Sequence, residues 1–223
     1  AWAYQTGESW PFGGPTASGG LVFQGTTSND LFALDEFTGA LVWKATLDGA
    51  ITAVPLYAAG VVYVGTNGGT MFALDAFSGA VIWSNSAFGY IDFSTPSYDG
   101  TNLYFGSFGN DAFYAEDAAT GAIVWTTPIT APVGTTVAYA HGFVYANAWD
   151  GIFRVMNATT GAVVEAHSLN AFASTSAPAI SDGWIWFEDY FGNIYGFSGQ
   201  MQIGFTLSPS SQSMDTVPNS MVN

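Results

Sequence analysis

The sequence predicts an all-β protein, a β-propeller of about five four-stranded antiparallel blades. Three observations lead to this prediction. A turn motif recurs about every 40 residues, short apolar runs alternate with turn-forming residues, and no stretch of a dozen residues keeps the 3.6-residue apolar period of a helix. Solenoid repeats are shorter or helical, so a repeat of four short strands in about 40 residues fits a propeller blade better than a solenoid. A plain β-sandwich is the alternative fold.

Length and composition fit one folded domain followed by a polar tail. Apolar residues make up 49% of the 223 residues and aromatic residues 17%, which is enough material for a large core. No apolar run is long enough for a membrane-spanning helix, so we expect no direct insertion into a membrane. We expect the propeller to occupy residues 1–207 and a polar tail to occupy residues 208–223. The expected repeat units are residues 1–46, 47–88, 89–130, 131–170 and 171–207.

The second unit illustrates the order of strands that we expect in each blade. Residues 53–57 are the expected first strand, and the apolar run at residues 61–64 is typical of the second. The hairpin at residues 66–69 contains Asn and Gly, which tolerate the positive φ angles of tight turns. Residues 71–74 are the expected third strand, and the run that carries Trp83 is the fourth.

A D-x-x-[TS]-G turn joins the third strand of each unit to the fourth. Its Asp can accept backbone N–H bonds within the turn, and its Gly can adopt the left-handed conformation. Three copies are complete, a fourth has Asn in place of Asp, and a fifth near Gly199 keeps only traces. The residues expected to hold these turns are Asp35, Gly39, Asp75, Gly79, Asp117, Gly121, Asn157 and Gly161.

In its longer form, A-x-D-x-x-[TS]-G-x-x-x-W, the motif resembles the tryptophan-docking motif of PQQ-type propeller repeats in the quinoprotein alcohol dehydrogenase-like superfamily. The resemblance covers residues 1 to 207. It implies that Trp43, Trp83 and Trp125 pack between adjacent blades, against the backbone of the neighbouring motif. The superfamily contains quinone-dependent dehydrogenases and also non-catalytic scaffolds, such as the periplasmic propeller lipoprotein of outer-membrane protein assembly. The fold alone therefore does not decide the function.

The features that the dehydrogenases of this superfamily carry are largely missing. The resemblance implies about eight blades for such enzymes, together with a vicinal cysteine pair, a basic residue near the quinone and a calcium site. This chain has five units, no cysteine, one Lys and one Arg. We therefore predict that the protein is not an enzyme and binds no cofactor. A PQQ-dependent dehydrogenase, or a fragment of one, is the alternative.

The charge balance excludes several classes of partner. Lys44 and Arg154 are the only basic residues against 17 acidic ones, which gives a formal net charge of −15. Without a basic patch to displace counterions, nucleic acids and anionic membrane surfaces are excluded as partners. A surface covered by uncharged polar residues suits an exported protein. We expect an extracellular or cell-surface location, with the periplasm as the alternative.

Five acidic residues lie in or near the expected hairpins between second and third strands. They are Asp30, Asp111, Asp150, Glu188 and Asp189. If they gather on one rim, their oxygens could bind Ca²⁺. No D-x-[DN]-x-[DN]-G calcium loop is present, so turn formation and solubility are the favoured roles.

Other candidate functional residues have simpler structural explanations. His141 and His167 lack the spacing of paired metal ligands, and we expect them in ordinary loops. Asn157 begins the only N-glycosylation sequon, but it also stands where the other turns have Asp. No G-x-S-x-G motif marks a nucleophilic serine.

Five aromatic residues fall in expected turns. Packing between blades is the favoured role for them, and a carbohydrate platform or a subunit contact is the alternative. These residues are Tyr90, Phe108, Trp149, Tyr190 and Phe191.

The N-terminal residues provide an extra strand. Trp2 precedes the first second-strand run by nearly the same distance as Trp43 and Trp83 precede theirs. Trp2 and Tyr4 therefore mark a fourth strand that lacks its own blade, because residues 202–207 already provide a fourth strand for the last unit. Donation of the extra strand to a neighbouring molecule would cover its open edge and link subunits.

These observations together predict a non-catalytic, exported β-propeller that acts as a structural or adhesive scaffold. We expect it to form a homo-oligomer or a polymer, which could be filamentous, through its terminal strands. Other surface proteins and glycans are further candidate partners, and a glycan-binding propeller is an alternative function. Docking on a propeller would order the polar residues 208–223, which we expect to be disordered alone.

Overall fold

The structure, a computed structural model, describes residues 1–7, 12–169, 176–198 and 208–209. These residues form twenty β-strands and no helix. The strands make five four-stranded antiparallel sheets, and each sheet keeps the order of its strands along the chain. The all-β propeller fold that the sequence predicts is confirmed, with each sheet forming one blade.

The blades follow one another along the chain. Blade 1 contains β1 (Thr16–Ser18), β2 (Leu21–Gly25), β3 (Asp30–Asp35) and β4 (Leu41–Thr46). Blade 2 contains β5 (Leu56–Ala58), β6 (Val61–Gly65), β7 (Met71–Asp75) and β8 (Val81–Asn85). Blade 3 contains β9 (Ser97–Tyr98), β10 (Asn102–Ser107), β11 (Ala112–Asp117) and β12 (Ile123–Pro128). Blade 4 contains β13 (Ala138–Ala140), β14 (Phe143–Asn147), β15 (Ile152–Asn157) and β16 (Val163–Ser168). Blade 5 contains β17 (Ala179–Ser181), β18 (Trp184–Glu188), β19 (Ile194–Ser198) and β20 (Ser208–Pro209).

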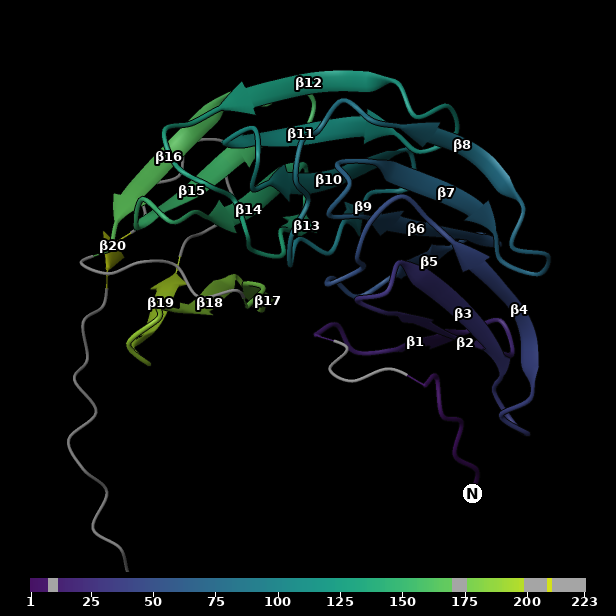
Figure 1. Cartoon of the computed structure of the whole chain (residues 1–223). Helices are drawn as coiled ribbons and strands as arrows, with labels where there is room; N and C mark the ends of the chain where they lie inside the picture. The colour runs from purple at the N-terminus through teal and green to yellow at the C-terminus, as the bar shows by residue number, and fades with distance from the viewer. Residues whose placement is uncertain (8–11, 170–175, 199–207, 210–223) are drawn as a thin grey trace, which may run out of the picture.

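The five blades are arranged in an open arc (Figure 1). The first strands lie on the inner side of the arc, and neighbouring ones contact each other, as β1 contacts β5 and β13 contacts β17. The fourth strands β4, β8, β12 and β16 lie on the outer side. Blade 1 and blade 5 are at opposite ends of the arc, so each has one face that no other blade covers.

The core lies between the blades rather than within one sheet. One cluster joins Phe23 and Trp43 of blade 1 to Val62 and Val64 of blade 2. Similar clusters lie between the later blades. A second strand is thus buried on both faces, which explains why β6 reads as a continuous apolar run instead of alternating with polar residues. The fourth strands begin with exposed apolar pairs, as Val81 and Ile82 in β8 illustrate.

The two ends of the blades carry different connections. We name the end that carries the hairpins between second and third strands the hairpin face; the hairpins lie at residues 26–29, 66–70, 108–111, 148–151 and 189–193. Fourth strands also end on this face, because they run antiparallel to the third strands. The D-x-x-[TS]-G turns lie at the opposite end, which we name the turn face.

The fourth strand of blade 5 differs from the expected one. Residues 202–207, which the sequence suggests for this strand, lie outside the described residues. The structure instead has β20, in which Ser208 pairs with Ser198 and Pro209 with Phe197. These two residues belong to the segment expected to be a polar tail. No helix in the described residues has the length and apolar character needed to cross a bilayer.

Candidate functional surfaces

Each D-x-x-[TS]-G turn is held by its first side chain. Oδ1 of Asp75 accepts hydrogen bonds from the backbone N of Phe77 at 3.1 Å, the backbone N of Ser78 at 2.8 Å and the hydroxyl of Ser78 at 2.7 Å. The hydroxyl of Ser78 is the main cause that holds the pKa of Asp75 below its ordinary value. Oδ1 of Asn157 accepts the same three kinds of bond at 3.0 to 3.2 Å. The amide oxygen of Asn157 thus takes the place of the Asp carboxylate in this turn. Glycosylation of Asn157 stays a prediction.

A tryptophan of the fourth strand joins each of the first three blades to the next. The indole Nε1 of Trp43 donates to the carbonyl of Ala76 at 2.8 Å, and its ring lies against Gly79. Gly79 has a φ of 72°, and a Cβ at this position would lie 2.7 Å from the indole ring. A side chain there would be strained and would displace the tryptophan. Trp83 and Trp125 dock in the same way on the turns of blades 3 and 4.

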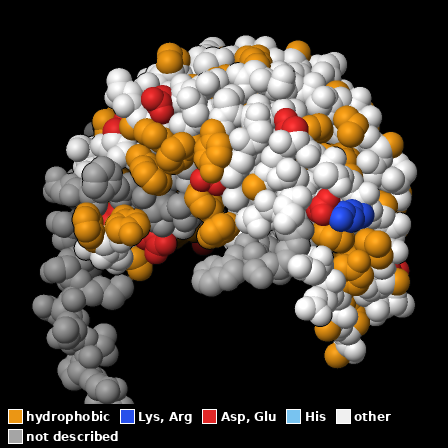
Figure 2. Space-filling view, viewed as in Figure 1, with side chains coloured by type: hydrophobic (Ala, Val, Ile, Leu, Met, Phe, Trp, Pro, Cys, Tyr) orange, Lys and Arg blue, Asp and Glu red, His pale blue; other side chains and the backbone are white. Residues whose placement is uncertain are grey.

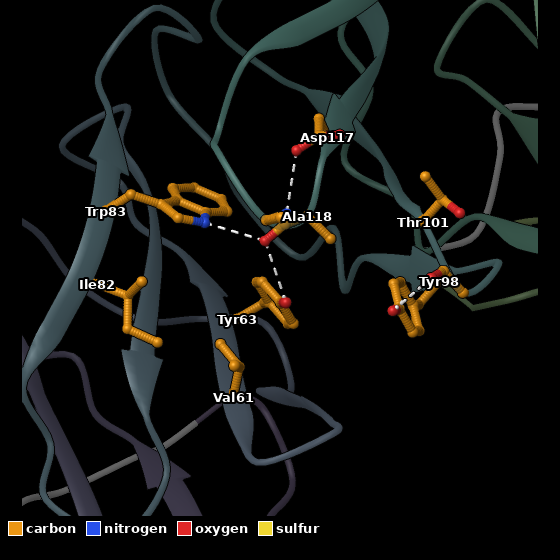
Figure 3. A pocket seen from close by; sticks show the side chains of 10 residues that line it. Val61, Tyr63, Ile82, Trp83, Tyr98, Thr101, Asp117 and Ala118 are labelled. Atoms are coloured by element: carbon orange, nitrogen blue, oxygen red, sulfur yellow. Dashed lines mark hydrogen bonds between the residues drawn. The ribbon is translucent and has the colours of Figure 1, made fainter.

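A cavity of about 310 Å³ opens beside Trp83, between blades 2 and 3. Figure 3 shows the hydroxyl of Tyr63 and the indole of Trp83 converging on the carbonyl of Ala118, to which they donate at 3.2 and 3.0 Å. Ala119 lines this cavity at the motif position that Phe77 occupies in the preceding blade. The two donors that face this cavity are therefore already engaged.

An aromatic pair lies in each of the first three blade interfaces. In each pair, a residue of the second strand stacks on a residue of the next blade's first strand. The ring centroids are 5.8 Å apart for Phe23 and Tyr57, 6.4 Å for Tyr63 and Tyr98, and 5.5 Å for Tyr104 and Tyr139. Stacking of this kind adds to the apolar area that the blades bury against each other.

The interface between blades 4 and 5 is more polar. Glu165 stands at the motif position of tryptophan, and its Oε2 is 3.3 Å from Nε2 of His167. The buried hydroxyl of Tyr145 and Oε1 of Glu165 have no hydrogen-bond partner among the described residues. Burial raises the pKa of Tyr145. His167 lies in β16 rather than in the expected loop, whereas His141 lies in the turn after β13 with a φ of 50°.

One face of blade 5 exposes side chains whose counterparts are buried in the other blades. We name the face of a blade that its successor covers the outgoing face. Trp186 is 36% exposed on this face and Ile194 is 75% exposed, whereas their counterparts in blades 1 to 4 are at most 5% exposed. The counterparts of Trp186 are Phe23, Tyr63, Tyr104 and Tyr145, and those of Ile194 are Leu31, Met71, Phe113 and Phe153. Within the described part of the chain, the outgoing face of blade 5 is therefore an uncovered blade interface.

The N-terminal residues lie on blade 1 in the position of a preceding blade's fourth strand. The indole Nε1 of Trp2 donates to the carbonyl of Glu36 at 2.9 Å, and its ring lies against Gly39 like those of the other motif tryptophans. Tyr4 contacts Phe32, with ring centroids 6.0 Å apart. Within the described residues this segment pairs with no strand. A docking tryptophan is thus present beside blade 1 without a sheet of its own.

Three of the five turn aromatics form a row on the hairpin face, which we name the aromatic row. The ring centroids of Tyr90 and Phe108 are 5.7 Å apart and those of Phe108 and Trp149 are 5.0 Å apart, both edge to face. Tyr90 and Trp149 are exposed. Tyr190 and Phe191 contact each other separately, in the hairpin of blade 5, and are also exposed. Figure 2 shows that hydrophobic side chains gather in several places on the surface, with scattered acidic side chains and one basic side chain in view.

The acidic residues considered for calcium are spread over the hairpins of four blades, with only Glu188 and Asp189 at the same hairpin, and neighbouring groups bind several of them. Asp30 accepts from Nζ of Lys44 at 2.6 Å and from the hydroxyl of Thr46 at 2.6 Å. Asp189 accepts from the amide of Asn193 and the hydroxyl of Tyr195. The structure does not bring three or more His, Asp or Glu side chains together as a possible metal site in any part of the chain that it describes.

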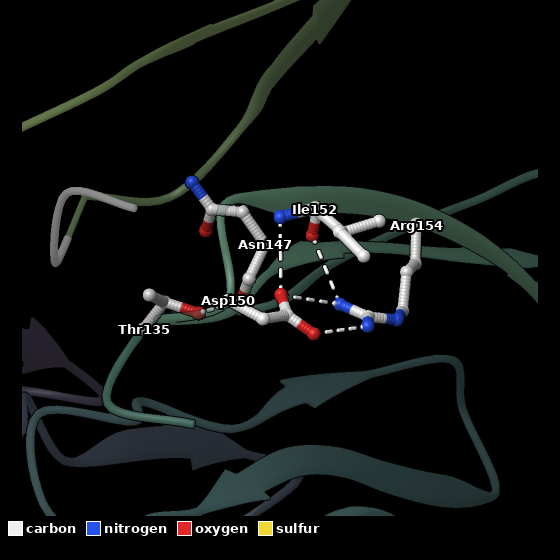
Figure 4. Close-up of polar contacts among 5 residues, drawn as sticks. All are labelled: Thr135, Asn147, Asp150, Ile152 and Arg154. Carbon is white, nitrogen blue, oxygen red and sulfur yellow. Dashed lines mark hydrogen bonds and ion pairs between the residues drawn. The ribbon is translucent and has the colours of Figure 1, made fainter. Parts of the chain in front are cut away.

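Asp150 forms a partly buried ion pair with Arg154 in the hairpin of blade 4 (Figure 4). Nη1 of Arg154 donates to Oδ1 of Asp150 at 3.0 Å and to the carbonyl of Ile152 at 3.0 Å, while Nη2 binds Oδ2 of Asp150. The backbone N of Ile152 also donates to Asp150 at 3.0 Å. Both basic side chains of the protein are thus paired with acidic side chains at hairpins.

Sequence reasoning misses several buried polar side chains, and Glu116 and Asn147 are two of them. Glu116 accepts a hydrogen bond from Nδ2 of Asn85 at 3.1 Å, and burial raises the pKa of Glu116 to about 8. The sequence does contain a signal that Glu116 is buried, because Glu116 stands at the motif position that Leu34 and Leu74 occupy in the first two units. Asn147 is fully buried, and its amide has no hydrogen-bond partner in the described structure. Local sequence gives no sign of this.

Comparison with known proteins identifies one matching family. The family described as outer membrane protein assembly factor BamB matches residues 2–107 and 79–200. The crystal structure of BamB from Moraxella catarrhalis is similar to this chain, with a TM-score of 0.76 and 25% sequence identity over 89% of this chain and 64% of that one.

Two enzymes also show similarity. The large subunit of glycerol dehydrogenase from Gluconobacter thailandicus is 40% identical over 62 residues, which cover 25% of this chain and 8% of that protein. A europium-containing methanol dehydrogenase has a TM-score of 0.66 and 15% identity, over 83% of this chain and 53% of the enzyme, which shows the fold alone. The chain thus spans less than two thirds of the length of each protein that it matches here.

Proposed function

Because the chain belongs to the family of the outer membrane protein assembly factor BamB, we propose that it is a non-catalytic propeller that acts by binding proteins, outside the cytoplasm. The name of that family refers to assembly of proteins rather than to a reaction. The paired state of both basic side chains and the absence of cysteine also favour a binding role over a quinone-dependent reaction. The location is the cell surface, the extracellular space or the periplasm.

The proposed role is that of a structural or adhesive scaffold that associates with its own copies. The observation that carries this proposal is the uncovered outgoing face of blade 5. Trp186 and Ile194 are exposed there, although the same positions are buried in four other blades. Burial of apolar surface is the main driving force of protein association, so a second molecule that covers this face would be stabilised.

Sedimentation velocity of the purified chain tests self-association. From about 0.5 to about 50 µM, the weight-average sedimentation coefficient is expected to rise as species larger than the 23.4 kDa chain accumulate. A single species of one chain at every concentration would contradict the proposed scaffold.

A second candidate function is binding of another surface protein or a glycan through the aromatic row. The exposed rings of Tyr90 and Trp149, with the amide of Asn67 donating to the hydroxyl of Tyr90 at 2.9 Å, favour this alternative. Rings beside neutral hydrogen-bonding groups suit a sugar or an uncharged peptide surface. A glycan array probed with the chain and with Trp149→Ala tests it: hits that the variant loses would support glycan binding.

The dehydrogenase alternative rests on the short match to an enzyme subunit. Titration of the chain with PQQ and Ca²⁺, followed by absorbance, distinguishes it from the scaffold. A saturable shift of the PQQ spectrum would favour the enzyme.

A further inference from the structure

The outgoing face of blade 5 has the same register as the faces that bury against a successor. Trp186 pairs with Gly196 across β18 and β19, as Phe23 pairs with Ala33 in blade 1. Ile194 lies two residues before Gly196 and so points to the same side of the sheet, next to Trp186. A molecule that follows blade 5 as blade 2 follows blade 1 would therefore cover both side chains.

The opposite face of blade 1 has room for a large side chain from a preceding blade. In blades 2 to 4, the first-strand residue that stacks on the preceding blade is a tyrosine. Ala17 stands at this position in blade 1, because it pairs with Val22 as Tyr57 pairs with Val62. Ala17 is exposed. An Ala at this position complements Trp186, which is larger than the Phe or Tyr found at its position in the other blades.

The edge of β19 has room for a further strand. In blade 1, the fourth strand pairs with β3 from Asp30 to Leu34. In blade 5, β20 pairs only with Phe197 and Ser198. Among the described residues, the segment from Ile194 to Gly196 therefore has no strand on this edge.

The N-terminal segment matches the part of this edge that no described strand occupies, and it does not overlap Ser208 and Pro209. Trp43 pairs with Ala33, and Ala45 pairs with Leu31. The same register would pair Trp2 of a second copy with Gly196, and Tyr4 of that copy with Ile194. Within the described residues, β20 contacts only Phe197 and Ser198 of β19. The proposed pairs use Gly196 and Ile194, so they start at the residue directly before Phe197.

We propose that blade 5 of one copy is completed by the N-terminal end of a second copy. Blade 1 of the second copy covers the outgoing face of the first, Trp186 fits beside Ala17, and the segment around Trp2 adds to β19 as the outer strand. The two uncovered faces lie at opposite ends of the arc (Figure 1), so the contact is head to tail and can repeat. This inference rests on the proposed self-association and specifies its surface.

Two variants each disrupt one of the two faces that form the proposed contact. Ile194→Asp places a charge on the outgoing face, and Ala17→Trp fills the space that Trp186 would occupy. Each variant alone is expected to weaken association by about tenfold or more, in sedimentation velocity, relative to the native chain. The matched control is Ile123→Asp, in which a 42% exposed isoleucine of β12 outside the proposed contact receives the same charge. Unchanged melting temperatures establish that the variants fold.

A mixture of the two variants distinguishes a head-to-tail contact from other contacts. Ile194→Asp keeps an intact blade 1, and Ala17→Trp keeps an intact blade 5, so an equimolar mixture is expected to form dimers but no longer species. If the native chain associates and both variants associate equally well, the proposed contact is wrong while self-association stands. If the native chain stays monomeric, both proposals fail.

Discussion

Glu116 is a buried acid that gives the protein a pH-dependent stability. Burial raises the pKa of Glu116 to about 8 in the folded protein, from an ordinary value of 4.5. The folded state therefore keeps a proton that the unfolded state releases. The stability that this proton contributes is fully present below pH 4.5 and is lost as the pH rises through 8. The largest slope expected from one such group is about 1.4 kcal/mol per pH unit.

Glu116→Gln is expected to flatten this pH dependence. The amide stays neutral and keeps an oxygen that can accept from Nδ2 of Asn85. The free energy of unfolding of the native chain, from urea titrations, is expected to fall between pH 5 and pH 8 by a few kcal/mol, and that of the variant to fall much less. Glu36→Gln, at an exposed turn residue, is the control. Equal slopes for the native chain and Glu116→Gln would contradict the assignment.

Among the elements, the tryptophan-docking turns give the most direct test of blade packing. Gly161 has a φ of 72°, and a Cβ there would lie 2.7 Å from the ring of Trp125. Gly142 has a φ of 83°, but a Cβ there would meet nothing within 4 Å. The two glycines therefore share the backbone requirement and differ in the contacts that β12 makes at Gly161, which are the ring of Trp125 and the hydroxyl of Thr127, also 2.7 Å from such a Cβ.

Gly161→Ala is expected to destabilise the protein more than Gly142→Ala. Both substitutions carry the cost of a left-handed alanine, about 1 kcal/mol. Gly161→Ala also pushes Trp125 away from the turn of blade 4, which should cost about 2 kcal/mol more. Urea denaturation measures the difference. Equal losses in the two variants would mean that the docking of Trp125 and Thr127 on this turn does not hold the blades together.

Strands and turns could be predicted from the sequence because their signals are local. The expected second and third strands of blade 2 agree with β6 and β7 to within one residue. The aromatic row could not be predicted, since Tyr90, Phe108 and Trp149 meet only when two blades are packed. β20 escaped prediction for a related reason. Ser208 and Pro209 lack the apolar pattern of a strand, and the strand forms because they pair with the edge of β19.

On the scale of the whole molecule, the number of blades is predictable but the shape of their array is not. The repeated turn gives five units, and the structure has five sheets. Whether blades close into a ring depends on the angle between neighbours, which is set by side chains packed across each interface. Glu165, in the polar interface between blades 4 and 5, and Trp186, on the outgoing face of blade 5, are two such interface side chains. The open arc then determines which surfaces remain for a partner.

The head-to-tail contact can be tested by a single disulfide between two copies. The native chain has no cysteine, so one cysteine per copy gives an unambiguous cross-link. Tyr4→Cys and Ile194→Cys would face each other as Ala45 faces Leu31 within blade 1, at a separation that suits a disulfide. Mixing differently tagged copies under mild oxidation is expected to give a covalent heterodimer of these two variants. Cross-linking no stronger than that of Tyr4→Cys with Ile123→Cys would contradict completion of blade 5 by a second copy.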